Sequence, residues 1–291
     1  NKKGFHKAPG QFDWSVTDGN FDKIGKHNYK TVIANFGSST QPWAAPDGVP
    51  NGTTIGGVYY KNIYAPTNVS YTTEAVQAFV TKYRDKINAV HFGNEPYYGE
   101  QHHAYWYDTP ENFAANTKAA YTGAKAADSS IPFISAGFYG KSSGGDYLDT
   151  LLNLDDYKNA FDYISFHGDY SSYKYLRNTL IENGYNDIPL VNSEGYYYGS
   201  TESGKPKDWS ANNMMFVLDY LNQFKNGIKY ITYFGIDEYK NDEIRVNEGG
   251  STHGLFRKSP YVEPRQGAVI AYNLFEKLSP GIEYKSEYSY Q

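Results

Sequence analysis

The sequence predicts an α/β fold in which parallel strands alternate with helices and close into a (β/α)8 TIM barrel. Three observations lead to this prediction. Short runs rich in Val, Ile, Phe and Tyr alternate with longer helix-like segments. A glutamate closes the stretch that begins with each of two of these runs, and a turn-forming residue follows it at once, Pro96 after Glu95 and Gly195 after Glu194. The glutamates lie about 100 residues apart, or about three β/α units of roughly 30 residues each, so their strand ends would face each other across one barrel mouth.

The predicted strands are short runs of β-branched and aromatic residues, each preceded by a polar or helix-like stretch. Strands that alternate with helices favour a parallel sheet whose faces are covered. The runs are Thr31–Phe36, Ala89–Phe92, Pro132–Ala136, Tyr163–Phe166, Pro189–Asn192 and Tyr230–Phe234.

Helices are predicted between these strands. Thr109-Pro110-Glu111 has the order expected at a helix start, namely a capping residue, a proline in the first turn and an acid. Asn-Gly pairs at 183–184 and 226–227 indicate helix ends. The predicted helices are Thr73–Lys86, Pro110–Ala127, Tyr147–Ala160, Tyr173–Asn183, Asn212–Lys225 and Arg265–Lys277.

Only six strand–helix units are visible. If Glu95 ends strand 4 and Glu194 ends strand 7, the visible strands are strands 3 to 8. Residues 1 to 29 contain one short helix candidate, Phe21–His27, and no run of β-branched residues. We therefore expect residues 1–291 to form a single barrel domain whose strands 1 and 2 lie upstream of Asn1, with an upstream segment or a second chain completing it. The alternatives are two unrecognised weak strands or an open sheet.

The composition argues against several classes of function. With 27 basic and 32 acidic side chains, the formal net charge is −5 and no basic run occurs, so nucleic acid and anionic membrane surfaces are not expected partners. No apolar stretch approaches the roughly 18 residues of a membrane span. Zero cysteines exclude disulfides and cysteine–zinc sites. His91, His102, His103 and Glu100 form no His-Glu-x-x-His motif, so no metal or other cofactor is expected.

The order of the motifs resembles clan A of the glycoside hydrolases, which are retaining enzymes on a (β/α)8 barrel, and within it the β-xylosidase and α-L-iduronidase family. The resemblance rests on Asn-Glu-Pro at 94–96, Ser-Glu-Gly at 193–195, Ile-Ser-Phe-His at 164–167 and His-Gly-Leu-Phe-Arg at 253–257. It implies that Glu95 is the acid/base, that Asn94 binds the sugar 2-hydroxyl and that Glu194 is the nucleophile.

The chain departs from the clan pattern at three places that shape the sugar subsite. Gly93 stands where many members have Trp, and Tyr-Phe-Gly at 233–235 replaces a Trp at the end of strand 8. In the clan a tyrosine usually follows the strand-6 histidine closely, whereas this chain has Gly-Asp-Tyr at 168–170. The departures bear on sugar specificity and leave the reaction type unchanged.

Retention requires two carboxyl groups about 5 to 5.5 Å apart. The acid/base must first donate a proton and then accept one, so we expect apolar surroundings and the charge of Glu194 to raise the pKa of Glu95. Glu194 must stay ionised to attack the anomeric carbon. His167 would orient a catalytic carboxylate or bind substrate, and the alternative is a core histidine with satisfied hydrogen bonds.

Aromatic residues follow several predicted strands, on the face where such barrels carry their active sites. Aromatic faces stack on sugar rings, although an 18% aromatic fraction also places tyrosine elsewhere by packing alone. Asp237 and Glu238 would contact substrate or stabilise their loop. The expected substrate-binding residues are Asn94, His167, Tyr170, Trp43, Tyr97, Tyr196, Phe234, Asp237 and Glu238.

These features predict a secreted or cell-surface hydrolase that cleaves glycosidic bonds in a polysaccharide or oligosaccharide by a two-glutamate double displacement. The alternative is a carbohydrate-binding or structural surface protein on the same barrel without activity. Two carboxylates favour the enzyme, whereas the missing tryptophans and strands favour the binding protein.

Overall fold

The computed structural model describes residues 4–27, 29, 31–37, 40–53, 59–97, 105–139, 142–195, 209–233, 269 and 273, without the side chains of 142–144, 209–216 and 233. The chain divides into two compact units. Unit 1 comprises Asn1–Phe166 with Tyr175–Pro189, and unit 2 comprises His167–Lys174 with Leu190–Gln291. The single-domain organisation expected from the sequence stays a prediction.

The sheet of unit 1 contains four of the predicted strands. In chain order they are β3 (Ile33–Asn35), β4 (Ala89–His91), β5 (Phe133–Tyr139) and β6 (Tyr163–His167), of which the last residue belongs to unit 2. β3 pairs with β4 and β4 with β5, both in parallel. All of β4 and nearly all of β5 is buried, which explains their almost continuously apolar sequences. These strand predictions are confirmed.

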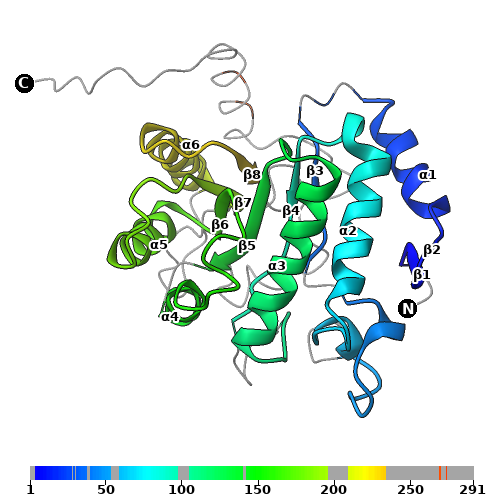
Figure 1. The fold of residues 1–291 in the computed structure, drawn as a ribbon. Helices are drawn as coiled ribbons and strands as arrows, with labels where there is room; N and C mark the ends of the chain where they lie inside the picture. The colour runs from blue at the N-terminus through cyan, green and yellow to red at the C-terminus, as the bar shows by residue number, and fades with distance from the viewer. Residues whose placement is uncertain are drawn as a thin grey trace, which may run out of the picture. The chain divides into compact units, whose positions relative to one another are not determined.

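Two long helices lie side by side over one face of this sheet, as Figure 1 shows: α2 (Ser70–Tyr83), which a 3-10 turn (Arg84–Lys86) continues, and α3 (Pro110–Ala127). The predicted start of α3 is confirmed, because Thr109 Oγ1 accepts from Asn112 N at 3.2 Å and caps the helix. Two short 3-10 turns, Pro42–Ala44 and Tyr60–Asn62, occur between β3 and α2.

The prediction for the next helix is wrong at both ends. The sequence indicated Tyr147–Ala160, whereas α4 spans Ser142–Leu152. Residues 153–160 fold into successive turns instead. Within these turns Tyr157 is fully buried, and its hydroxyl is hydrogen-bonded to Ser135 on β5. A contact between distant parts of the sequence therefore ends the helix where local propensity would have continued it.

The helix α5 (Tyr170–Glu182) begins earlier than the predicted Tyr173. Asp169 caps it, because Asp169 Oδ1 accepts from Ser171 N at 2.9 Å and from Ser172 N at 3.2 Å. The first turn of α5 belongs to unit 2 and the remainder to unit 1.

The described core of unit 2 is a strand–helix–strand segment. It contains β7 (Leu190–Gly195), α6 (Trp209–Lys225) and β8 (Ile231–Tyr233), with β7 and β8 paired in parallel. The Asn-Gly pair at 226–227 ends α6 as predicted, with Gly227 at φ 78°. These strands and this helix are confirmed, whereas the predicted helix Arg265–Lys277 lies outside the described residues except for 269 and 273.

The N-terminal region contains a small antiparallel sheet that the sequence did not predict. β1 (His6–Ala8) pairs with β2 (Gln11–Phe12), and α1 (Ser15–Ile24) follows, beginning before the predicted Phe21–His27. Among the described residues this pair is separate from the parallel sheet, whose first strand is β3. The expectation that residues 1–29 contribute no barrel strand therefore holds for the described residues of that range.

Aromatic packing explains the hairpin. The Phe5 ring stacks on Trp14 at 4.9 Å and lies 5.6 Å from Phe79 on α2. Phe12 stacks on Trp14 at 5.3 Å, and Phe36, just beyond β3, packs edge-on against Phe79 at 4.9 Å. Large aromatic side chains thus attach a short strand pair that has no β-branched residues of its own.

Phe79→Ala is expected to lower the free energy of unfolding by about 3–5 kcal/mol, because Phe79 is only 8% exposed and its ring joins the hairpin, α1 and β3. Urea unfolding measures the change. The matched control is Val16→Ala on α1, where the side chain is 55% exposed and a change within about 0.5 kcal/mol is expected. Equal costs for the two variants would contradict the structural role of the aromatic cluster.

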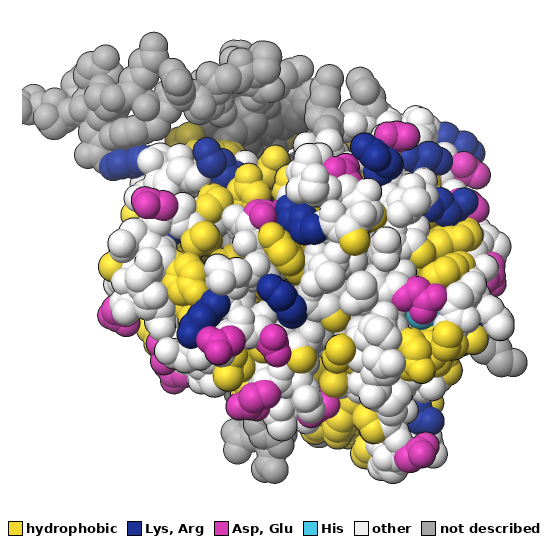
Figure 2. All heavy atoms as spheres, viewed as in Figure 1, with side chains coloured by type: hydrophobic (Ala, Val, Ile, Leu, Met, Phe, Trp, Pro, Cys, Tyr) yellow, Lys and Arg dark blue, Asp and Glu magenta, His cyan; other side chains and the backbone are white. Residues whose placement is uncertain are grey.

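Charges of both signs are mixed on the surface. In Figure 2 the lysine and arginine side chains lie interspersed with aspartate and glutamate on the face shown. Ion pairs between charged side chains occur in unit 1, such as Lys125 with Asp162 at 2.7 Å and Lys82 with Asp18 at 3.3 Å. Within the described part of the chain, no helix combines the length and the apolar character that crossing a membrane requires.

Candidate active site

The backbone of the first predicted glutamate is hydrogen-bonded to β5 in unit 1. Glu95 N donates to Gly137 O at 2.9 Å, and Asn94 forms a parallel bridge with Gly137. Glu95 also has φ 41° in the left-handed region, the only non-glycine residue with positive φ in the described structure. This conformation costs an ordinary residue about 1–2 kcal/mol. Such strain persists where the surroundings fix the backbone, and it concentrates at functional sites.

The packing around Gly93 explains why this chain lacks the tryptophan that many clan members have at this position. Its φ is 97°, and a Cβ at this position would lie 2.8 Å from both Ala136 Cβ and Phe113 Cζ. The residue before Asn94 therefore has no room for any side chain in this packing.

Gly93→Ala is expected to destabilise the protein by about 1–3 kcal/mol more than a glycine replacement that meets no neighbour. Gly184→Ala is the matched control, because Gly184 has φ 84° and nothing within 4 Å of its added Cβ, so it costs only the backbone strain of about 1–2 kcal/mol. Urea unfolding of both variants separates strain from crowding. Equal destabilisation would show that Gly93 is needed for its conformation alone.

The second predicted glutamate lies in unit 2 beside the predicted histidine. Glu194 Oε2 is 3.5 Å from His167 Nδ1, and His167 Nε2 is 3.1 Å from Ser193 Oγ. The His167 side chain is 1% exposed and that of Glu194 is 22% exposed. The structure therefore brings together two residues that are distant in the sequence. A buried imidazole between a hydroxyl and a carboxylate is the arrangement that an orienting histidine needs.

The separation of the Glu95 and Glu194 carboxyl groups stays a prediction, because the two residues belong to different units. Tyr97 follows Glu95 and is half-buried. Tyr170 is also half-buried, with its ring stacked on Tyr173 at 5.5 Å and Lys174 Nζ at 5.3 Å from the ring centroid. The predicted residues Tyr196, Phe234, Asp237 and Glu238 lie outside the described residues.

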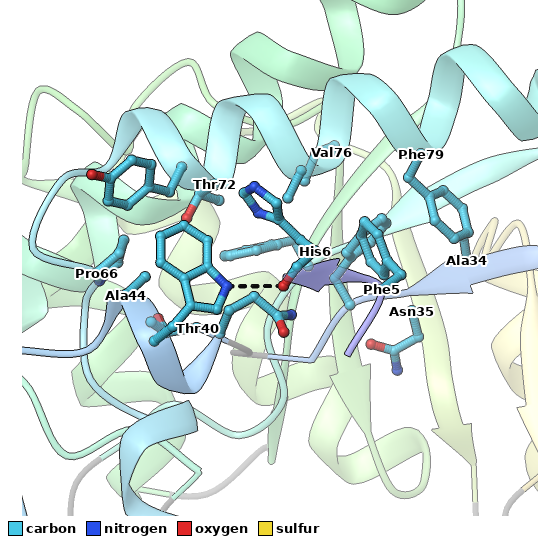
Figure 3. Close-up of a pocket in the computed structure, with 16 residues that line it drawn as sticks. Phe5, His6, Ala34, Asn35, Thr40, Ala44, Pro66, Thr72, Val76 and Phe79 are labelled. Atoms are coloured by element: carbon cyan, nitrogen blue, oxygen red, sulfur yellow. Dashed lines mark hydrogen bonds between the residues drawn. The ribbon is translucent and has the colours of Figure 1, made fainter. Parts of the chain in front are cut away.

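Trp43 lies against the N-terminal hairpin. Its indole N–H donates to His6 O at 2.9 Å, the dashed line in Figure 3, and its ring lies 4.9 Å from Tyr71. It lines a mostly apolar cavity of about 270 Å³ between the hairpin, β3 and α2, into which Phe79 and Val76 also face. Glu95 is not among the lining residues. Trp43 thus has a structural contact besides the predicted stacking on a sugar.

Three buried polar residues near Glu194 were missed by the sequence analysis. Asn192, Gln223 and Asp219 form a hydrogen-bonded chain from β7 to α6. Asn192 could have been noticed as a polar residue inside a buried strand. The spacing of Asp219 and Gln223, one helical turn apart, is too common on helices to indicate a partner.

Of the comparisons with known proteins, the one with solved structures finds similar folds. No family model matches the chain, and no curated protein is similar enough to match. A glucosidase from Croceicoccus marinus is 14% identical with a TM-score of 0.59, over 93% of this chain and 54% of that one. A family 39 glycoside hydrolase from Bacteroides cellulosilyticus WH2 is 16% identical with a TM-score of 0.62, over 92% and 55%. Xylanase 10B from Thermotoga maritima is 14% identical with a TM-score of 0.58, over 94% and 82%.

These structural neighbours are clan A glycoside hydrolases, and their fold is the TIM barrel, which establishes the predicted fold class for this chain. The chain spans about half the length of the glucosidase and of the family 39 enzyme. At 12–16% identity the likeness concerns the fold alone.

Proposed function

We propose that this chain is a retaining glycoside hydrolase in which Glu95 is the acid/base and Glu194 is the nucleophile. The contact between the Glu194 carboxylate and the buried His167 is the observation that carries the proposal. It gives the second carboxylate an oriented position at the end of a barrel strand. The strained backbone of Glu95, beyond the end of β4, adds support, because such barrels carry their active sites on the face where the strands end.

In the proposed first step, the Glu194 carboxylate attacks the anomeric carbon while the bond from that carbon to the leaving oxygen breaks. Glu95 gives its proton to that oxygen, so the leaving group departs as a neutral alcohol. In the second step the Glu95 carboxylate takes a proton from water. The oxygen of that water attacks the same carbon and releases Glu194 as a carboxylate. Two inversions at one carbon give net retention.

His167 and Asn94 are proposed to assist. His167 holds one carboxylate oxygen of Glu194, which leaves the other oxygen to attack. Asn94 precedes the acid/base and would hydrogen-bond the sugar 2-hydroxyl, an interaction that strengthens as charge develops on the ring. Tyr97, Tyr170 and Trp43 are proposed to contact other parts of a glycan.

The proposed substrate is a poly- or oligosaccharide outside the cell or at its surface. The solved neighbours include a glucosidase, two endo-xylanases, a β-xylosidase and a β-galactosidase. Aryl β-glucosides, β-xylosides and β-galactosides are therefore the first substrates to test.

The test follows each aryl glycoside by release of the phenol and determines the anomer of the first-formed sugar by proton NMR. Turnover with a β-sugar as the first product is expected. An α-sugar from a β-glycoside would mean inversion and carboxyl groups about 6.5–9.5 Å apart, which contradicts the proposed mechanism. Glycan binding by calorimetry without turnover on any member of the panel would favour an inactive carbohydrate-binding protein instead.

A further inference from the structure

A chain of buried polar side chains in unit 2 connects α6 to β7. Gln223 Nε2 donates to Asp219 Oδ2 at 2.6 Å. At the other end of the same amide, Gln223 Oε1 accepts from Asn192 Nδ2 at 2.9 Å. Asn192 and Gln223 are fully buried, and Asp219 is 8% exposed. Because buried polar groups are costly unless they are hydrogen-bonded, such a connected chain favours one arrangement of its members.

This series of hydrogen bonds, which we call the relay, ends on the backbone of Glu194. Asn192 Oδ1 accepts from Glu194 N at 3.2 Å, and Asn192 Nδ2 also donates to Gly168 O at 2.8 Å. Gly168 N in turn donates to Glu194 O at 2.9 Å. The pairing of β7 with β8 shifts register between Asn192 and Gly195. The side chain of Asn192 therefore holds the backbone of Glu194 where the regular strand pairing is interrupted.

The Asp219 carboxylate at one end and Gly168 O at the other favour the same direction for the hydrogen bonds between these side chains. An ionised aspartate can only accept hydrogen bonds, so Gln223 has to turn its NH₂ group toward Asp219 and its oxygen toward Asn192. Asn192 then has to turn its NH₂ group toward Gln223 and its oxygen toward Glu194 N. A donor at position 219 would oppose this direction. Either two N–H groups meet at Gln223, or both amides reverse, which sets two N–H groups together at Glu194 and two oxygens together at Gly168.

The surroundings of Asp219 bring its ionisation close to neutral pH. Burial raises the pKa of Asp219 to about 6, while the hydrogen bonds from Tyr170 N and Gln223 lower it and the charge of Asp169 raises it. Tyr170 N, at 2.7 Å, belongs to the first residue of α5, where the helix dipole favours a negative charge. Above a pH of about 6 the ionised Asp219 can therefore only accept hydrogen bonds. Below that pH its carboxyl group carries a proton and can also donate one.

We propose that Asp219 is a positioning residue for Glu194 and acts through the amides of Gln223 and Asn192. Its catalytic meaning rests on the proposed function, in which Glu194 is the nucleophile. The hydrogen-bond relay itself does not depend on that function and has its own test.

Asp219→Asn is expected to disrupt the relay, because the new amide at position 219 gives its oxygen to Tyr170 N and turns its NH₂ group toward the NH₂ group of Gln223. Adding Gln223→Glu should restore it. A carboxylate at position 223 accepts from the new NH₂ group with one oxygen and from Asn192 with the other. Gln223→Glu alone would place two carboxylates together. The control is Asp155→Asn, which makes the same chemical change at a side chain that is 98% exposed.

Hydrogen exchange of the Glu194 amide, measured by NMR on the full chain at pH 7.5, reports on the relay directly. We expect exchange about tenfold or more faster in Asp219→Asn, a return to within about threefold of wild type in the double variant, and no change in Asp155→Asn. Unchanged exchange in Asp219→Asn, or a double variant no closer to wild type than Asp219→Asn, would overturn the proposal.

The wild-type chain gives a second test if Asp219→Asn does not fold. The carboxyl carbon shift of Asp219 and the amide shift of Glu194 are followed between pH 4 and pH 8, together with the ring shifts of His167, which also contacts Glu194. One shared midpoint near 6 for Asp219 and the Glu194 amide is expected. A Glu194 amide that follows only the titration of His167 would overturn the relay.

Kinetics separate this proposal from the proposed function. If the wild type cleaves an aryl glycoside, Asp219→Asn should lower kcat by about 10- to 100-fold with little change in KM, and the double variant should recover most of it. If the wild type cleaves none, the proposed function fails while the exchange experiment still decides on the relay.

Discussion

Glu194→Gln is expected to lower kcat on an aryl glycoside by a factor of about 10⁴ or more, because the variant has no carboxylate to form the covalent intermediate. Glutamine keeps the size of the side chain and still offers an oxygen toward His167 Nδ1, which lies 3.5 Å from Glu194 Oε2 in the native protein. Binding should therefore survive. Calorimetry with an uncleaved glycan measures Kd, and the release of phenol from the aryl glycoside over time measures kcat.

The matched control for this prediction is Glu182→Gln near the end of α5, which removes the same charge from an exposed side chain. Its kcat should equal that of the wild type. If Glu194→Gln retained more than about a tenth of the wild-type kcat, Glu194 would not be the nucleophile. If Glu194→Gln lost glycan binding as well as activity, while it unfolded at the same urea concentration as the wild type, Glu194 would have a binding role instead.

The central parallel strands β4 and β5 could be predicted from the sequence because they are buried on both faces. Such strands read as apolar runs whatever their neighbours are, as β4 and β5 illustrate. The start of α3 could also be predicted, since Thr109 and Pro110 act within the first turn of the helix itself. Local chemistry determines these features, so local patterns reveal them.

Features that depend on distant contacts could not be predicted. The hairpin β1–β2 has no strand signal, and rings far along the chain, such as Phe79, attach it. The helix α4 ends early where Tyr157 reaches Ser135 on another element. The candidate site divides in the same way. Sequence motifs located Glu95, Glu194 and His167, whereas the partners of Asn192 come from α6 and from the residue after β6.

Replacing Glu95 by Ala is expected to produce a different defect from the loss of the nucleophile. A substrate with a very good leaving group, such as a 2,4-dinitrophenyl glycoside, needs little protonation and should still transfer its sugar to Glu194. Release should then be slower by about 10²- to 10⁴-fold, because no base activates water. Rapid-mixing assays should show a burst of dinitrophenol followed by a slow steady rate, and mass spectrometry should detect the glycosylated chain.

Azide distinguishes this defect from a general loss of activity, because it is a small anionic nucleophile that needs no base. Adding azide to Glu95→Ala should raise the steady rate about tenfold or more, with a β-glycosyl azide as the product of a β-linked substrate. Azide should have no such effect on the wild type or on Glu194→Gln, which forms no intermediate to intercept. An α-glycosyl azide from Glu95→Ala would mean direct attack on the substrate without a covalent intermediate. That product, or full activity of Glu95→Ala without azide, would overturn the roles proposed for both glutamates.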